Sequence, residues 1–405
     1  MKKILPIEAN PPVSYNPGFA QPLSILYSGK IRNPDLYLMD RFIQLYFEKQ
    51  VCDDEKNALA FFLPGESIFS LLDMETVDDE ELTDHDIISR VCIEIRRNHY
   101  IQMMLQEYCI PGALFYKKND IIHQHLIFGF DDAKRIFYAL CHKENRRFGI
   151  LEIKFEDFLM AYNKRDSAPY SYVKIKPMKN VFINFKRDEY LKDSLYDYLH
   201  GENRFVFADS EPAICGVDIY GELIHFLHLG QIDMRDYQAL LQHKQIMSSR
   251  ISGYLNLSSL GEQYKKVLGL AVRTHSFALK WSLTQQEKDI SRIETTLYAM
   301  KQLEIAILSE VYTNVKQPRR TAKEKNNHKI VRPYNLDTKV RDTLWDVEVW
   351  DILEEYIPGV RNNSQLPLVY GMRLKKLIGK GHYVGVTPEQ EKEFLERILA
   401  LRSRE

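Results

Sequence analysis

The sequence lacks the features that mark several large classes of protein. It has no run of about 18 consecutive apolar residues, which argues against a membrane-spanning helix. The apolar run that follows the first two lysines ends at Pro6 and Glu8, so we expect no signal peptide. The five cysteines form no Cys-x-x-Cys pair, which predicts a reducing, cytoplasmic environment and no structural zinc. They are Cys52, Cys92, Cys109, Cys141 and Cys215.

Neither sign of charge is in excess. Lys and Arg total 55 against 56 Asp and Glu, so we do not expect nucleic acid as a partner. The sequence has no phosphate-binding loop, dinucleotide-binding glycine fingerprint, Gly-x-Ser-x-Gly elbow or His-Glu-x-x-His pair. His123 and His125 are spaced to share one face of a strand, but no further ligand has motif spacing. We therefore expect neither a metal nor a cofactor.

Helical and strand patterns predict an α+β fold for the first 180 of the 405 residues. A helix should begin near Gly18–Gln21, because Pro22 then falls early in the helix, where its missing N–H has no cost. The acidic run 73–86 is typical of a solvated loop, with docking of a basic partner as the alternative. The other elements that we expect here are helices over 34–49 and 86–107, a strand over 58–63, a turn and strand over 109–116, a hairpin over 121–132 and 135–142, a strand and helix over 148–162, and a strand over 170–177.

The remainder of the chain is predominantly helical in pattern. Helical periodicity over 188–200, 213–229, 234–254, 260–282 and 285–314 predicts a helical domain at 181–315. The basic run 316–333 is typical of an exposed linker, with a patch for an acidic carrier protein as the alternative. Residues 334–405 should form a small helical module for interaction or homodimerisation, whose last helix starts at Thr387-Pro388-Glu389.

The remaining chemistry that the sequence suggests is thiol catalysis on a papain-like scaffold. There a nucleophile lies at the start of the first helix, where the helix dipole and free N–H groups lower a thiol pKa. A His on a later strand is the base, and an acid or amide orients it. No cysteine lies in the first helix region, 16–26. Cys109 is the rival nucleophile, although it should lie at a helix C-terminus, where the dipole raises a thiol pKa.

The block 125–162 resembles a known family. His125, the strand Leu126–Asp132, Phe137-Tyr138-Ala139 and the segment Ile153–Tyr162 are similar to the N-terminal domain of butirosin-H-type, cysteine-peptidase-like proteins. Relatives of that domain occur beside nonribosomal peptide clusters in Gram-positive bacteria. The segment 216–255 resembles the helical half of the same proteins, and the resemblance covers roughly residues 1–310.

The resemblance implies a papain-like N-terminal domain and an amide-forming acyltransferase. Such an enzyme moves an acyl or peptidyl group from the phosphopantetheine thioester of a carrier protein to a small amine. The base falls on His125. The nucleophilic Cys falls on or near Ala20, and alanine cannot attack a thioester. Ala20 therefore marks either a natural non-catalytic relative or an engineered Cys→Ala change, and the intact Gly-Phe-Ala-Gln-Pro context favours the change.

The family's orienting acid falls near Cys141, which is not a carboxylate and which we expect to be a buried apolar residue. Asp131 and Asp132, at the hairpin tip, should lie about 20 Å along the strand from His125. Glu144 and Asn145 follow Cys141 and are the preferred candidates. All four residues are equally typical of turns. Asn16 or Gln21 is the candidate oxyanion-hole amide.

Three functions remain open. The first is acyl transfer to an amine by a thiol at position 20 with His125 as base. The second is a cysteine peptidase or thioesterase that uses the same site with water as acceptor. The third is a non-catalytic relative that binds a carrier protein or peptide, for which the missing Cys is the best support.

Overall fold

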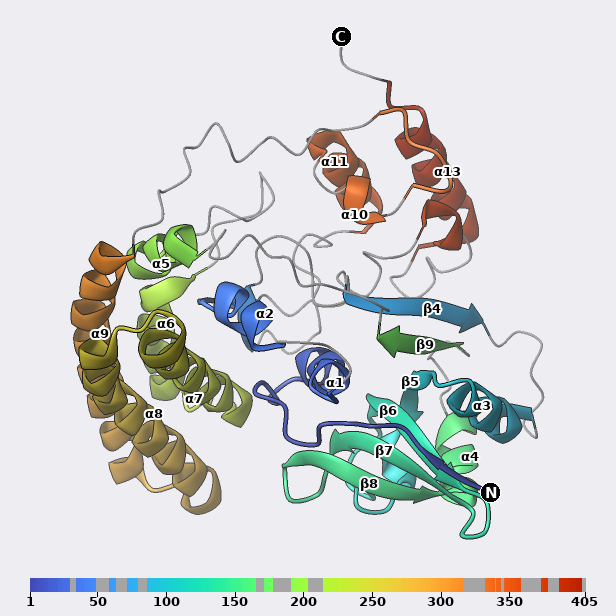
Figure 1. Ribbon diagram of the computed structural model, residues 1–405, viewed down its shortest axis with the longest axis horizontal. Helices are drawn as coiled ribbons and strands as arrows, with labels where there is room; N and C mark the ends of the chain where they lie inside the picture. The colour runs from blue at the N-terminus through green and yellow to red at the C-terminus, as the bar shows by residue number, and fades with distance from the viewer. Residues whose placement is uncertain are drawn as a thin grey trace. The chain divides into compact units, whose positions relative to one another are not determined.

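The structure is a computed structural model (Figure 1), and its described residues form two compact units. Unit 1 comprises Met1–Arg32, Ile68–Phe182 and Lys380–Gly385, and unit 2 comprises Asn33–Ser67, Ile183–Gly379 and Val386–Glu405. Strands dominate unit 1 and helices dominate unit 2, which confirms the α+β class. The described residues are 1–29, 34–48, 58–62, 71–78, 86–164, 171–177, 191–202, 214–315, 332–338, 340–343, 346–357, 373–377 and 386–402.

Unit 1 is built on an antiparallel sheet. Its strand order is β4-β9-β5-β6-β7-β8, and β1 pairs with the end of β6. The strands are β1 (Lys2–Ile4), β4 (Leu72–Asp78), β5 (Tyr100–Gln106), β6 (Ile122–Asp131), β7 (Ile136–His142), β8 (Phe148–Lys154) and β9 (Ser171–Pro177). The expected hairpin is confirmed as β6 and β7, and the expected strands over 148–154 and 170–177 as β8 and β9.

The turn chemistry of the hairpin explains why the sequence pattern was reliable there. The Asp131 carboxylate accepts the N–H groups of Ala133 and Lys134, which closes the turn locally. Gly129 lies at the register shift between β6 and β7. A Cβ at this position would approach the Lys3 carbonyl oxygen to 3.0 Å, so the close packing of β1 favours glycine.

Helices cover both faces of this sheet. The helices are α1 (Pro17–Leu26), α3 (Asp86–Arg96) and α4 (Phe155–Asn163). Phe137 of β7 packs against Phe155 and Phe158 of α4, with ring centroids 4.6 and 4.8 Å apart. On the other face, Gln21 of α1 bonds to Gln102 of β5. Gln102 pairs with Leu126, which in turn pairs with Leu140, so these three side chains share one face of the sheet. Phe137 is three residues before Leu140 on β7, so its side chain points to the other face. Alternation therefore puts α1 and α4 on opposite faces of the sheet.

Four sequence-based expectations for the first half of the chain are wrong. The helix expected over 34–49 ends at Arg41 as α2 (Pro34–Arg41), and β2 (Gln44–Glu48) follows and pairs with β3 (Ala58–Phe62). The helix expected over 86–107 ends at Arg96, and β5 begins at Tyr100. Within the acidic run, Leu72–Asp78 is a strand, and in 109–116 the chain turns without forming one.

Three of these errors have a physical source that the structure shows. Short apolar runs such as Phe42–Phe47 fit a buried helix and a buried strand equally well, and the partner strand decides between them. After α3, Asn98 adopts a left-handed backbone (φ 64°) that ends the helix. In β4, carboxylates alternate with Leu72 and Met74, and that alternation is compatible with an edge strand.

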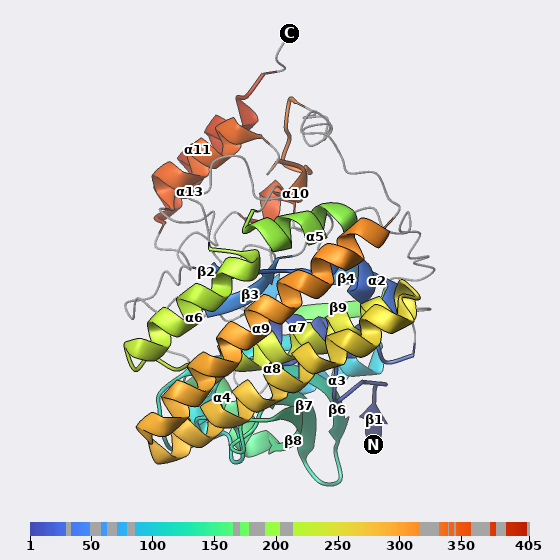
Figure 2. The same cartoon turned by 90° about the vertical axis from the view of Figure 1, so that its left-hand side faces the viewer.

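Unit 2 contains the long helices that the periodicity predicts, and α8 and α9 run side by side (Figure 2). A π-helical turn, Arg250–Tyr254, follows α7. The helices of this region are α5 (Leu191–His200), α6 (Ile219–His228), α7 (Met234–Ser249), α8 (Ser258–Thr284) and α9 (Glu287–Asn314).

Arg250 attaches α2 to these helices. Its guanidinium is fully buried and donates to the carbonyl oxygens of Leu38, Met39 and Phe42 at 2.7–3.0 Å. Carbonyls at a helix C-terminus lack intrahelical donors and carry partial negative charge, so a buried cation suits this position. Residues 33–67 accordingly belong to unit 2. The domain division expected from the sequence, at residue 180, places them in the first domain instead.

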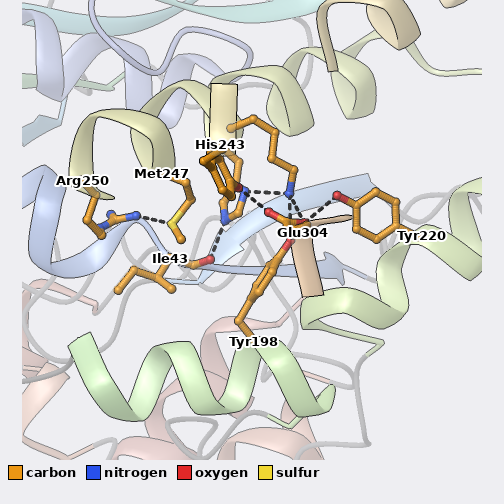
Figure 3. Close-up of polar contacts among 9 residues, drawn as sticks. Ile43, Tyr198, Tyr220, His243, Met247, Arg250 and Glu304 are labelled. Carbon is orange, nitrogen blue, oxygen red and sulfur yellow. Dashed lines mark hydrogen bonds and ion pairs between the residues drawn. The ribbon is translucent and has the colours of Figure 1, made fainter. Parts of the chain in front are cut away.

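A buried ion pair lies among the helices of unit 2 (Figure 3). The Lys244 Nζ atom of α7 is 2.8 Å from Oε2 of Glu304 in α9, and both side chains are fully buried. Lys244 also donates to the Tyr198 hydroxyl at 2.8 Å and to His243 Nδ1 at 3.0 Å. His243 donates its Nε2–H to the Ile43 carbonyl, which leaves Nδ1 free to accept. All three ammonium protons of Lys244 therefore have acceptors.

The Glu304 carboxylate is satisfied in the same way. Oε2 accepts the hydroxyls of Tyr198 of α5 at 2.9 Å and Tyr220 of α6 at 2.6 Å. Oε1 accepts the hydroxyl of Tyr264 of α8. Helices α5 to α9 each contribute a polar group to one buried network, which we call the Glu304 network. Complete pairing is what makes such a buried charge tolerable.

The C-terminal residues form a module with its own core. Arg332 is buried and makes a two-pronged ion pair with Asp346, which also accepts the Tyr334 hydroxyl. Arg332 thus belongs to the module rather than to the linker expected over 316–333. Thr387 caps the last helix with the expected N-cap. The helices are α10 (Val340–Thr343), α11 (Val347–Tyr356) and α13 (Pro388–Leu399), and the core includes Val349, Trp350, Leu353, Phe394, Leu395 and Ile398.

We expect Lys244→Met to lower the free energy of unfolding by about 3–5 kcal/mol, because Glu304 is left buried without its cation. Adding Glu304→Gln removes the orphaned charge, so the double variant should lose less than the sum of the two single variants. Urea unfolding followed by circular dichroism measures this coupling.

A matched control is the exposed pair Lys265 and Glu262 on α8, whose charged atoms are 2.6 Å apart. Lys265→Met should cost less than about 1 kcal/mol, because water already solvates both charges. Similar losses at the two pairs would contradict the role that we assign to burial.

Asp236, at the start of α7, generates a pH prediction. It is buried and accepts the Leu59 N–H, and burial is the main cause that raises its pKa to about 7. The folded carboxyl therefore holds its proton at a higher pH than the unfolded one, so this stabilisation is lost as pH rises from about 4 through 7. Asp236→Asn keeps the acceptor, and we expect it to exceed the wild type in stability at pH 8 by up to about 4 kcal/mol. Urea unfolding at pH 8 and pH 4 measures the difference, and an equal difference at both would refute the assignment.

Candidate functional site

The first helix begins where the sequence predicts. Asn16 is the N-cap, and its side-chain oxygen accepts the Gly18 N–H at 2.7 Å. Pro17 follows at the first helical position, where its missing N–H has no cost. Ala20 lies one turn into the helix, and none of its surface is exposed. The position that the resemblance assigns to the nucleophile therefore holds a buried methyl group.

The candidate oxyanion-hole amides are used by the fold itself. Gln21 donates its Nε2–H to the Gln124 carbonyl at 3.1 Å, and its Oε1 accepts from Gln102 Nε2 at 2.8 Å. Gln21 is fully buried, and the Asn16 side chain caps α1. These bonds hold α1 against the sheet.

His125 lies on the sheet face opposite to α1. It pairs with Met103, between the pairs Gln102–Leu126 and Met104–Gln124. Since Gln102 faces Gln21, alternation directs His125 to the face that α4 covers. The ring is fully buried. The structure does not bring the imidazole of His125 and the helix of Ala20 to the same side.

Glu107 is the carboxylate that accompanies His125, and the sequence analysis missed it. It follows β5 in the 3₁₀ turn η2 (Glu107–Cys109) and is fully buried. Its Oε1 is 3.1 Å from His123 Nδ1 and 3.8 Å from His125 Nε2. Its Oε2 accepts the Phe115 N–H at 3.2 Å. The sequence analysis missed Glu107 because it expected a helix over 86–107. A helix there cannot form the pairing between β5 and β6 that brings Glu107 close to His125.

The pKa values at this cluster reflect burial and mutual charge. Burial lowers the pKa of His125, and the Glu107 carboxylate opposes that effect. Burial acts to raise the pKa of Glu107, but the His123 hydrogen bond and the charge of His125 outweigh it and lower the pKa. Glu107 is therefore a buried carboxylate whose charge two imidazoles stabilise.

A different histidine lies next to the entry of α1. His142 is two residues beyond Leu140 on β7 and so shares the face of Leu126 and Gln102. Its Nε2 donates to the Ser14 carbonyl at 3.0 Å. Of the imidazoles on β6 and β7, His142 is the one on the side of α1, although the sequence motif points to His125.

The expected orienting acids lie elsewhere. Asp131 closes the hairpin turn at the far end of β6 from His125, and Asp132 pairs with the Met1 amino group and Arg96 at 3.4 and 3.5 Å. Glu144 lies 3.3 Å from Lys118, and Asn145 accepts the N–H of Arg147. None of these four is bonded to His125, and the carboxylate that lies beside its ring is Glu107, 3.8 Å from Nε2.

The described cysteines have the character of core residues. Cys92, Cys109, Cys141 and Cys215 are free and buried. Burial raises the pKa of Cys92 and of Cys215 to about 12, and it also raises those of Cys109 and Cys141. None of them lies in α1. Cys52 falls outside the described residues.

Among the residues that the structure describes, no group of three or more His, Cys, Asp or Glu is arranged to hold a metal ion. No helix within those residues is both long enough and apolar enough to cross a bilayer.

We expect the buried thiols to be inert in the folded chain. With a pKa of about 12, Cys92 and Cys215 should react with iodoacetamide at pH 7.5 roughly a thousandfold more slowly than a free thiol, because only the thiolate attacks. Peptide mass mapping of native and urea-unfolded samples measures each site separately. Fast labelling of either cysteine in the native chain would contradict the burial of its thiol.

No protein-family model matches this sequence, and a search of curated proteins finds no significant relative.

Proposed function

We propose that this chain is a non-catalytic binding protein. The observation that carries the proposal is that Ala20, Gln21 and His125 are completely buried. A group that handles a substrate must touch it, and a methyl group supplies no electron pair for attack on a thioester.

The two faces of the sheet support the same conclusion. A base must lie within hydrogen-bonding reach of the proton that it removes. His125 faces the α4 side of the sheet, whereas α1 packs on the other side through Gln21 and Gln102. A thiol introduced at position 20 would have the sheet between it and the His125 ring.

The resemblance of residues 125–162 to the N-terminal domain of butirosin-H-type proteins indicates the class of ligand. We propose that the chain binds an acyl or peptidyl group on the phosphopantetheine arm of a carrier protein, without cleaving its thioester. The papain-like character of unit 1 is part of this proposal.

Amide-forming acyl transfer is the second candidate, with hydrolysis as its variant in which water is the acceptor. The observation in its favour is the 3.8 Å approach of Glu107 to His125, since a carboxylate beside an imidazole is the base-orienting half of a thiol-dependent site. The candidate requires a cysteine at position 20 and a rearrangement that brings the two faces together.

The deciding experiment uses the full-length chain and its Ala20→Cys variant. Each is mixed with an acyl-pantetheine thioester and with the corresponding acyl-loaded carrier protein. Intact mass spectrometry detects a covalent acyl-enzyme, and fluorescence anisotropy of a labelled carrier detects binding. A binding protein should gain no acyl mass in either form and should bind the loaded carrier with the same affinity in both.

The control variant is Ala161→Cys, which introduces a thiol at another fully buried alanine, in α4. It measures the background acylation of a new thiol in a helix. An acyl mass gain that is found only in Ala20→Cys and is lost when amine is added would refute a non-catalytic role and support acyl transfer. Failure of the loaded carrier to bind either form would refute the proposed ligand.

A further inference from the structure

Glu107 presents an unusual charge balance. Its carboxylate is fully buried, and among the described residues its ion-pair partners are the imidazoles of His123 and His125. An imidazole is charged only when it binds a proton, so the net charge of this cluster depends on whether a proton is bound. A Lys or Arg partner would have removed that dependence.

The two ring nitrogens of His125 are in different situations. Nδ1 is 3.0 Å from the His123 carbonyl oxygen and must carry a proton to donate to it. Nε2 is buried and has no hydrogen-bond partner. The nearby Glu107 oxygen, at 3.8 Å, is too far for a hydrogen bond. Protonation of Nε2 would therefore place an imidazolium in the core without a close acceptor.

Glu107 also anchors the turn segment that follows it. Its Oε2 accepts the Phe115 N–H, and the Phe115 ring packs edge-on against His123 at 5.4 Å. The Glu107 N–H donates to the Ile121 carbonyl, so the residue ties both ends of the segment Glu107–Ile121 together. His123, with 35% of its side chain exposed, connects the cluster to solvent.

We propose that Glu107, His123 and His125 form an acid-sensitive latch, which holds the segment Glu107–Ile121 on the sheet at neutral pH and releases it as the pH falls below about 6.5. The released segment would expose the part of this sheet face that carries His123 and His125, beside the part that α4 covers. Proton binding would then control access to this face.

The direction of the pH effect follows from the groups that face His125. Burial lowers its pKa more than the Glu107 carboxylate raises it, and His123 adds to the lowering. The open state, in which His125 meets water, therefore binds a proton at a higher pH than the closed state. The lowered pKa of Glu107 keeps its carboxylate ionised over this pH range, and Cys141, which interacts with Glu107, stays protonated because its pKa is raised.

Hydrogen exchange of the full-length chain tests the latch. Protection factors of amides 110–120, corrected for intrinsic exchange, are compared at pH 7.5, 6.5 and 5.5. Uptake of one proton should lower protection by up to about tenfold per pH unit below 6.5. In His125→Asn, whose amide can still donate to the His123 carbonyl, the protection factors should be independent of pH over this range.

His99→Asn is the matched control. His99 lies in the same unit, 2.7 Å from the buried carboxylate of Glu94, and its pKa is also lowered, mainly by burial. This variant should keep the wild-type profile over 110–120. If His125→Asn does not fold, NMR of the wild type decides, since the ring titration of His125 and the protection of Phe115 should share one midpoint. Protection that does not change with pH in the wild type, or an equal loss in His125→Asn, would overturn the latch.

Discussion

The Lys244–Glu304 ion pair is the constraint on which the helical unit depends. Two opposite charges are completely buried there, and their attraction offsets the cost of removing them from water only when every donor and acceptor is also paired. The three tyrosine hydroxyls and His243 supply those partners from different helices. Displacement of any one of these helices would leave a buried polar group unpaired, so the network specifies a single arrangement of α5 to α9.

The buried charge of unit 1 is less completely paired. Glu107 is also a buried carboxylate, but its partners are imidazoles rather than an ammonium ion. The Glu304 network keeps its cation close through a 2.8 Å contact, whereas His125 leaves Nε2 without a partner. The difference in pairing makes one cluster a structural centre and the other a site that responds to protons.

At the candidate site, residues of the sequence motif are present, but they are not arranged for catalysis. The histidine of the motif is present, and so is a carboxylate beside it, yet both lie on the face of the sheet away from α1. The amide at position 21 is bonded within the fold, and position 20 is a methyl group. These residues stabilise the packing of unit 1, which is why we favour binding over catalysis for this chain.

The elements whose signals are local could be predicted from the amino-acid sequence. The start of α1 depends on Asn16 and Pro17, the β6–β7 hairpin on its two apolar runs and the Asp131 turn, and the long helices on their periodicity. The run after α2 is a strand because of a tertiary contact, since its pairing with β3 outweighs a pattern that suits either form. A tertiary contact also places Glu107, rather than Glu144 or Asp131, beside His125. That choice depends on the register between β5 and β6, and register is a contact between segments that no local pattern contains.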